Sequence, residues 1–148
     1  MKGGKLLPKK VKKDKVIEKA KKQLGEEIAR CRGETRSQRN LASAVGLSPS
    51  NMKYIEDGVN APSAECYINL IDDLKPPPKQ QKKMDALYTT IRKTPPPDVC
   101  GTINNNQDLF DVFRLISDQI LSKEQITQAK ALFKSFADEH KGGNGNGK

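Results

Sequence analysis

The sequence has few of the residues that usually carry catalysis or bind metals. It contains no tryptophan, one histidine and three cysteines among 148 residues. The cysteines, Cys31, Cys66 and Cys100, lie far apart and form no CxxC or Cys/His cluster, so we expect no metal site. A lone histidine cannot organise a triad, no glycine-rich phosphate loop is present, and the adjacent Asp72 and Asp73 cannot face one point on a helix. These absences predict a protein that is not an enzyme and that uses no cofactor.

Long apolar runs are also lacking. No window approaches the roughly 18 apolar residues of a membrane-spanning helix, and the N-terminus lacks the apolar stretch of a signal peptide. The odd number of cysteines favours free thiols in a reducing compartment. We therefore expect a cytoplasmic protein with no membrane partner.

Aromatic residues are scarce as well. They make up 5% of the chain, whereas all hydrophobic residues together make up 34%. The core must therefore be built mainly from Leu, Ile, Val and Ala, which favours helices over sheets. We expect an all-α fold with one compact domain and appendages.

The formal net charge of +9 is concentrated near the N-terminus. Residues 1–22 carry ten lysines against Asp14 and Glu18, which gives +8, and the remaining 17 basic and 16 acidic residues give +1. A run of this kind is either a solvated tail or a segment that binds a phosphate backbone through counterion release. Charge alone leaves both interpretations open, so we define residues 1–22 only as a Lys-rich N-terminal arm.

Apolar spacing and proline punctuation predict the helices that follow. A first helix carries Leu24 and Ile28 and ends near Gly33, and three short helices follow between residues 37 and 74. A fifth helix is expected over 78–93, because triple prolines bound that segment and proline does not occur inside helices. These helices define a domain over residues 23–94.

The C-terminal region, residues 95–140, is expected to form a pair of amphipathic helices. "TINNN" is interpreted as a turn or capping region before the apolar segment "QDLFDVFRLISDQIL", and "SKEQ" is a capping box that opens the last helix. The tail 141–148, "KGGNGNGK", is predicted to be disordered. The wide apolar faces either fold back on the first domain or pair across a twofold axis. We expect a homodimer with the following interface residues: Leu109, Phe113, Ile116, Leu132, Phe133 and Phe136.

The segment 37–58, "SQRNLASAVGLSPSNMKYIEDG", holds two short helices joined at one glycine. Ser37 is a good N-cap for the first helix, and Gly46 can take the left-handed conformation that ends it. Ser48 then caps the second helix and Pro49 occupies its first turn, where a missing N–H costs nothing. This arrangement is a helix-turn-helix, which presents its second helix on the surface.

These residues resemble the lambda-repressor-like, or Xre-type, helix-turn-helix proteins of phages, plasmids and bacteria. The likeness runs from "LGEEIARCR" through "SQRNLASAVGLSPSNMKYIEDG" to "NAPSAECYINLIDDL", residues 24 to 74. The resemblance implies a five-helix DNA-binding domain. A looser likeness to the C-terminal extensions of some phage and mobile-element regulators covers "MDALYTTIRKTPPPDVCGTINNNQDLFDVFRLI".

The resemblance implies that the helix from Ser48 to Asp57 enters the major groove of double-stranded DNA, in a transcriptional repressor that binds a palindromic operator as a dimer. The protein would then be associated with the nucleoid. Glu56 and Gly58 are interpreted as structural. Expected base contacts are Pro49, Ser50, Asn51, Lys53 and Tyr54, and expected phosphate contacts are Arg36, Ser37, Gln38, Arg39, Asn60 and Ser63.

Each of these assignments has an alternative. Lys53 can simply be solvated, Tyr54 can cover the core, and Asn51 can be an exposed helical residue. The whole chain can also be an antitoxin or adaptor that holds another protein with its C-terminal helices. A third possibility is a nucleic-acid binder without sequence preference, driven by the Lys-rich arm.

Overall fold

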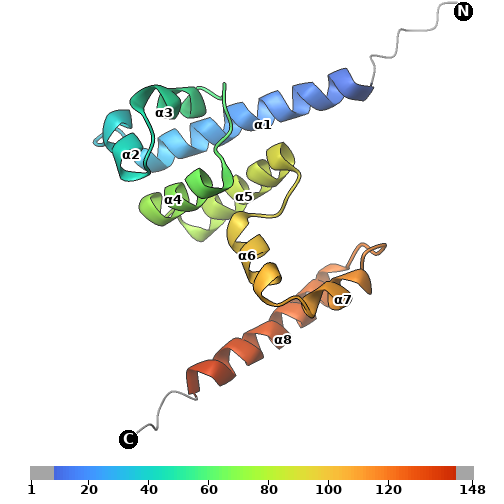
Figure 1. Ribbon diagram of the computed structural model, residues 1–148. Coiled ribbons are helices and arrows are strands. Elements are labelled where there is room, and N and C mark those ends of the chain that lie inside the picture. Colours follow the sequence, from blue (N-terminus) through green and yellow to red (C-terminus); the bar gives the residue numbers. More distant parts are fainter. Residues whose placement is uncertain (1–8, 143–148) are drawn as a thin grey trace, which may run out of the picture. The chain divides into compact units, whose positions relative to one another are not determined.

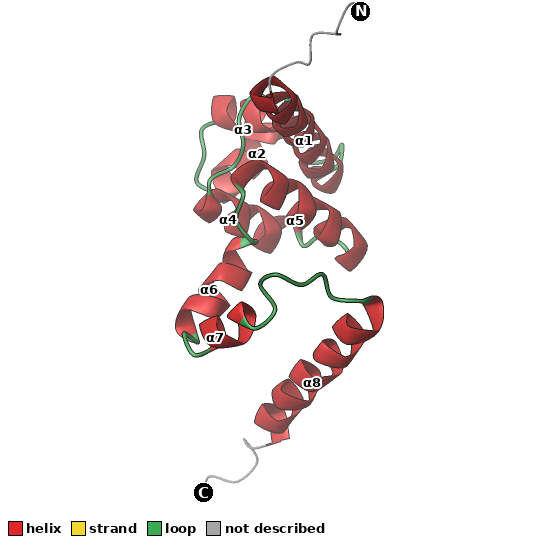
Figure 2. Cartoon of the chain, turned by 90° about the vertical axis from the view of Figure 1, so that its right-hand side faces the viewer, coloured by secondary structure: helices red, strands yellow, loops and turns green. Residues whose placement is uncertain are grey.

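The computed structural model describes residues 9–142, with side chains from residue 12 onward. Over this range the secondary structure consists of eight α-helices and no strand (Figures 1 and 2), which confirms the all-α prediction for the described part of the chain. None of the helices between residues 9 and 142 is long and apolar enough to span a bilayer.

The helices are α1 (Lys9–Arg32), α2 (Gln38–Ala44), α3 (Pro49–Glu56), α4 (Ala64–Leu74), α5 (Pro78–Arg92), α6 (Pro97–Asn105), α7 (Leu109–Arg114) and α8 (Lys123–Gly142). The chain divides into two compact units between Asn105 and Asn106. The first unit therefore includes α6, which packs against α4, although the sequence placed the domain boundary between residues 94 and 95. The segment "TINNN", which was predicted as a turn or capping region, is helical as far as Asn105 and belongs to the helix that begins at Pro97.

Helix α1 is much longer than the sequence predicted, because it begins at Lys9 and not near Leu24. The described part of the Lys-rich arm is thus helical, and residues 1–8 lie outside the described range. Lysine is a good helix former, and the half-buried Ile17 and buried Ala20 continue the apolar stripe of Leu24 toward the N-terminus.

The helix-turn-helix segment has the caps that the sequence predicted. The Ser37 hydroxyl accepts a hydrogen bond from the Asn40 amide at 3.1 Å, and the Ser48 hydroxyl accepts one from the Asn51 amide at 3.2 Å. Gly46 has φ +74°, the left-handed conformation that ends α2. Two helices of seven and eight residues therefore begin and end where local chemistry dictates.

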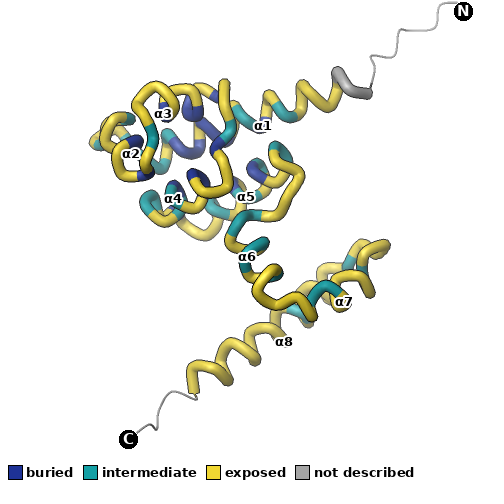
Figure 3. Tube along the Cα trace, in the orientation of Figure 1, coloured by how far each residue is buried: buried dark blue, intermediate teal, exposed yellow. Residues whose placement is uncertain are grey.

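The core of the first unit lies between α1, α2, α3, α4 and α5, where the buried positions gather in Figure 3. Each of these helices contributes residues that are almost fully inaccessible to solvent. The main members are Leu24, Ile28, Leu41, Ala42, Val45, Met52, Ile55, Cys66, Tyr67, Leu70, Met84 and Tyr88.

The second unit differs in part from the expected pair of amphipathic helices. Helix α7 ends at Arg114, so the apolar segment "QDLFDVFRLISDQIL" is helical only in part. The capping box is confirmed, because Ser122 and Gln125 satisfy each other's backbone amides at 2.8 and 3.1 Å. The tail predicted to be disordered was residues 141–148, but Lys141 and Gly142 belong to α8, so the prediction is wrong for these two residues. Residues 143–148 lie outside the described range.

Candidate nucleic-acid interface

Helix α3 has one buried side and one exposed side. Met52 and Ile55 point into the core, with 0% and 5% of their surface exposed. The opposite side is open to solvent, and Tyr54 is 47% exposed although it is aromatic. All five residues predicted to contact bases lie on α3 and are exposed: Pro49, Ser50, Asn51, Lys53 and Tyr54.

Two glycines bring α3 into backbone contact with α1. A Cβ atom on Gly25 would lie 2.4 Å from the carbonyl oxygens of Ile55 and Glu56. A Cβ atom on Gly58, where φ is +73°, would lie 2.4 Å from the Cα atom of Lys22. Because only glycine leaves room for this crossing, the position of the C-terminal end of α3 is set by main-chain contact with α1.

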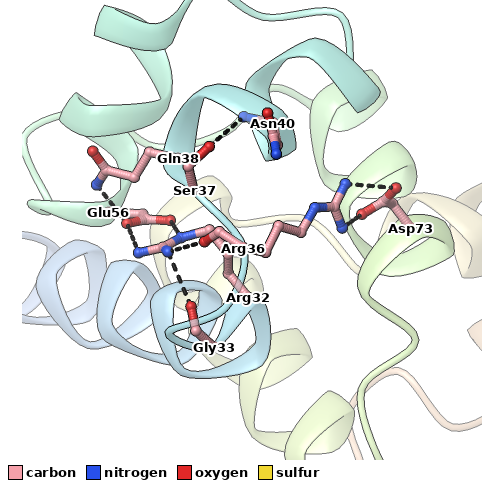
Figure 4. Close-up of polar contacts among 8 residues, drawn as sticks. All are labelled: Arg32, Gly33, Arg36, Ser37, Gln38, Asn40, Glu56 and Asp73. Carbon is pink, nitrogen blue, oxygen red and sulfur yellow. Dashed lines mark hydrogen bonds and ion pairs between the residues drawn. The ribbon is translucent and has the colours of Figure 1, made fainter.

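A buried carboxylate joins α1, α2 and α3 (Figure 4). Glu56, 8% exposed, accepts hydrogen bonds from the Arg32 guanidinium at 2.7 and 3.1 Å and from the Gln38 amide at 2.5 Å. The hydrogen bond to Glu56 raises the pKa of Arg32. Arg32 also donates to the carbonyl oxygens of Gly33 and Arg36. The network fixes the first turn of α2 against the last turn of α3, and it occupies the side chain of Gln38, a predicted phosphate contact.

Arg36 and Arg39 lie on either side of the N-cap Ser37 but have different surroundings. The Arg36 guanidinium donates to both carboxylate oxygens of Asp73 on α4, and this hydrogen bonding raises the pKa of Arg36 (Figure 4). Arg39 is exposed and forms no ion pair with any residue between 12 and 142. Of these two predicted phosphate contacts, only Arg39 has a positive charge that no described carboxylate neutralises.

Lys53 on α3 forms an ion pair with Asp57, four residues further on, at 2.5 Å. The hydrogen bond to Asp57 raises the pKa of Lys53. Both side chains are about half exposed, at 63% and 47%. Exposed pairs of this kind contribute little energy, so an incoming phosphate or guanine could displace the carboxylate at small cost.

The loop before α4 carries the two remaining predicted phosphate contacts, Asn60 and Ser63. Both are exposed, and the Ser63 hydroxyl caps α4 by accepting from the Cys66 amide at 3.2 Å. The loop packs beside α3, because Asn51, Asn60 and Ser63 line the same groove, which has a volume of about 560 Å³. Residues from α3 and from the start of α4 thus form one continuous surface.

Arg92, in the last turn of α5, was not predicted from the sequence. Its guanidinium reaches the loop before α4 and donates to the carbonyl oxygens of Ala61 at 2.9 Å and of Pro62 at 2.8 and 3.1 Å. No carboxylate of the described chain forms an ion pair with it. Arg92 therefore supports the loop and adds a positive charge to the same groove, which it helps to line.

The lysines of α1 form a stripe along the helix. Lys12, Lys15, Lys19 and Lys22 are exposed, and their spacing of three, four and three residues places them on one side. That side lies opposite the apolar residues that pack on the core, and these four lysines form no ion pair within residues 12–142. Lys21 differs, because it forms an ion pair with Glu18 at 2.5 Å and donates to the Val59 carbonyl oxygen at 3.4 Å.

The residues predicted to form the dimer interface lie in the second unit. Leu109 and Ile116 are half-buried, and the others are exposed by 43% to 55%: Phe113, Leu132, Phe133 and Phe136. Their role in pairing two chains stays a prediction.

Comparison of the chain with family models, with curated proteins and with solved structures finds no match in any of the three. A function for this surface must therefore be argued from its own geometry and charge.

Proposed function

We propose that this protein is a sequence-specific transcriptional regulator that binds double-stranded DNA through α3. In this proposal α1 to α5 form a lambda-repressor-like helix-turn-helix domain, and α3 lies in the major groove. The observation that carries the proposal is the two-sided character of α3. Its apolar side is buried and its end is held by main-chain contact at Gly25, while its other side exposes Pro49, short polar groups, Lys53 and Tyr54. A helix fixed so firmly can present the same side chains to every duplex it meets.

Each exposed side chain of α3 suits a particular contact. Asn51 can bond adenine through its amide, and Ser50 can bond either kind of base edge. The ring of Tyr54 can meet a thymine methyl group or donate to a phosphate, and Lys53 can reach guanine or a phosphate once it leaves Asp57. Pro49 can supply only apolar contact.

Side chains at both ends of this surface suit the phosphate backbone. Arg39 lies in the first turn of α2, is exposed, and forms no ion pair with an acid between residues 12 and 142. Asn60, Ser63 and Arg92 line the same groove at the start of α4, where the helix dipole also favours an anion. Contacts of this kind set the orientation of the protein on the duplex, and the contacts of α3 set the sequence preference.

We further propose that the protein acts as a homodimer on a palindromic operator, with half-sites about one helical turn, roughly 34 Å, apart. The exposed apolar side chains of the second unit support this arrangement. The activity fits a repressor of a mobile element or of its own operon, in the cytoplasm and at the nucleoid.

Selection from a pool of random duplexes tests the proposal. We expect enrichment of a consensus with inverted repeats, and we expect the variant Asn51→Ala to enrich a more degenerate site. Arg39→Ala, as the matched control, should lower the affinity without changing the consensus. If the wild-type protein enriches no sequence, the proposal fails, and salt-sensitive binding to every duplex would then indicate a nonspecific nucleic-acid binder.

A second candidate function rests on the second unit, where none of the residues between 106 and 142 is buried. Such a surface also suits an antitoxin or adaptor that holds another protein. The two functions are separated by the oligomeric state of the purified chain, since an adaptor would reach a stable mass only with a different partner chain bound.

A further inference from the structure

Two side chains of opposite charge lie next to each other on the exposed side of α3. Lys53 and Asp57, one helical turn apart, are both exposed, and the Lys53 Nζ atom lies 2.5 Å from the Asp57 Oδ2 atom. The third charged residue between 49 and 57, Glu56, is buried and accepts hydrogen bonds from Arg32 and Gln38. The exposed side of α3 therefore carries one positive and one negative charge and has no net charge.

The acid of this pair lies in line with residues that are proposed to read bases. Ser50, Tyr54 and Asp57 follow one another at intervals of four and three residues, which places them on one side of the helix. Asp57 is the C-cap residue and keeps helical backbone angles, φ −76° and ψ −6°, so the row continues to it. A major groove that takes up this side of α3 therefore also receives a carboxylate, and an ionised carboxylate can only accept hydrogen bonds.

The ion pair places a hydrogen-bond donor beside an acceptor, because a lysine ammonium only donates and a carboxylate only accepts. A G·C base pair has the complementary edge in the major groove, where the acceptor O6 of guanine lies beside the donor N4 of cytosine. Those two atoms are hydrogen-bonded to each other in the base pair and are thus roughly 2.9 Å apart. The spacing is close to the 2.5 Å between Lys53 Nζ and Asp57 Oδ2. The intact ion pair can therefore meet both atoms of this edge at once.

The three other base pairs match the ion pair less well. A C·G pair sets a donor against Lys53 and an acceptor against Asp57, and an A·T pair does the same. A T·A pair has thymine O4 and adenine N6 in the right order. It also brings the acceptor N7 of adenine beside the carboxylate, and it replaces the second acceptor of guanine, N7, by a methyl group beside the lysine. Only G·C satisfies both charges without an opposed group.

We propose that Lys53 and Asp57 act as one unit that reads a G·C base pair, with Lys53 donating to guanine O6 and Asp57 accepting from cytosine N4. The inference rests on the proposed function, in which α3 enters the major groove, and it names a base pair that this surface takes. Asp57 is then a specificity-determining residue. If Lys53 moved to a phosphate, it would leave the carboxylate unpaired beside the charged backbone, and such like-charge contacts discriminate against the wrong partner.

Exchanging the two charges tests the proposal. Selection from random duplexes identifies the operator, and fluorescence anisotropy then measures the affinity for operators in which single G·C pairs are replaced. For the wild-type protein we expect one G·C pair per half-site whose reversal to C·G lowers the affinity by roughly tenfold or more. Lys53→Glu combined with Asp57→Lys keeps the net charge and a four-residue ion pair but exchanges donor and acceptor, so this variant should prefer C·G at the same position.

The matched control is Asp111→Arg combined with Arg114→Asp, which exchanges the ion pair of α7 in the second unit. This control should keep the wild-type preference for G·C. Thermal unfolding followed by circular dichroism shows whether each variant is folded. An exchanged α3 pair that still prefers G·C, or that loses the preference without gaining one for C·G, would overturn the proposal.

Removing only the carboxylate gives a second measurement, which does not require a new contact to form. In Asp57→Ala the lysine is free to bind a phosphate, so the plot of log affinity for random duplex against log salt concentration should steepen by about 0.9, one phosphate contact. The preference for G·C should fall at the same time. Asp111→Ala makes the same change in net charge and frees Arg114 from its ion pair, and it should keep the wild-type slope. An unchanged slope or an unchanged preference in Asp57→Ala, or equal changes in both variants, would overturn the proposal.

The outcomes also separate this inference from the proposed function. A wild-type protein that selects no sequence would refute the proposed regulator and, with it, the reading of a base pair. A wild-type protein that selects an operator in which no G·C position responds to changes at Lys53 and Asp57 would refute only the inference.

Discussion

Replacing Gly25 by alanine should destabilise the first unit, although alanine is the better helix former. Gly25 lies inside α1, where Gly→Ala is worth about 1 kcal/mol in helix propensity. The new Cβ atom would, however, lie 2.4 Å from the carbonyl oxygens of Ile55 and Glu56 and 2.8 Å from the Glu56 carbonyl carbon. All three neighbours are backbone atoms, so no side chain can rotate away, and α3 must move by about 1 Å to restore ordinary contact.

The cost of that movement exceeds the gain in propensity. Overpacking a close-packed site costs roughly 1–3 kcal/mol, and weakening one charge-assisted hydrogen bond to Glu56 costs about 1.5–3 kcal/mol more. Subtracting about 1 kcal/mol for helix propensity leaves a net loss of about 1.5–5 kcal/mol in the free energy of unfolding. For a unit of this size the melting temperature should fall by on the order of 10 °C.

Urea and thermal unfolding followed by circular dichroism measure this effect. The matched control is Gly101→Ala in α6, where an added Cβ atom meets nothing within 4 Å. That variant should be more stable than wild type by up to about 1 kcal/mol, since only the propensity term remains. If Gly25→Ala is as stable as wild type, or if both variants shift in the same direction, the close crossing of α1 and α3 is not what positions α3.

Three further predictions concern single side chains. Asn51→Ala should relax base preference in duplex selection, whereas Arg39→Ala should weaken binding to operator and random duplex about equally. Arg92→Gln should flatten the plot of log affinity against log salt concentration by about 0.9, the contribution of one phosphate contact, and an unchanged slope would show that Arg92 only supports the loop. The hydrogen bond from Lys83 lowers the pKa of buried Glu27, so its contribution to stability is present above the pKa of the unfolded chain and is lost as the pH falls through the folded pKa. Glu27→Gln should therefore make the free energy of unfolding less sensitive to acid, and a pH profile identical to wild type would contradict this.

Features that depend on neighbours in sequence were predictable. The caps at Ser37 and Ser48, the left-handed Gly46 and the inward direction of Met52 and Ile55 each follow from local chemistry, and the structure has them. The same holds for the limits of α5, because a proline is tolerated at the start of a helix and excluded from its interior. Local rules were therefore sufficient to predict which side of α3 is exposed, although they do not show which residues α3 packs against.

Features that depend on distant residues were not predictable. Arg36 meets Asp73 across 37 residues, and Arg92 reaches Pro62 across 30, and no spacing in the sequence indicates either contact. Arg36 was consequently expected to bind phosphate, although its guanidinium is engaged with a carboxylate, and Arg92 was overlooked. The helical state of "TINNN" was missed for a related reason, since asparagine favours turns locally and packing of α6 on α4 outweighs that preference.

The helical state of the described part of the basic arm limits how its lysines could contact a phosphate backbone. A disordered run of lysines could wrap around a duplex, and it would lose conformational entropy on doing so. From Lys9 onward the backbone is already hydrogen-bonded as a helix, so Lys12, Lys15 and Lys19 project from a straight rod at fixed intervals. A straight rod cannot follow the curve of a groove for long, and its lysines can meet phosphates only where the rod passes one strand. We therefore expect the described part of the arm to make fewer phosphate contacts than its charge suggests. Each contact would, however, cost less conformational entropy, because the chain is already ordered as a helix.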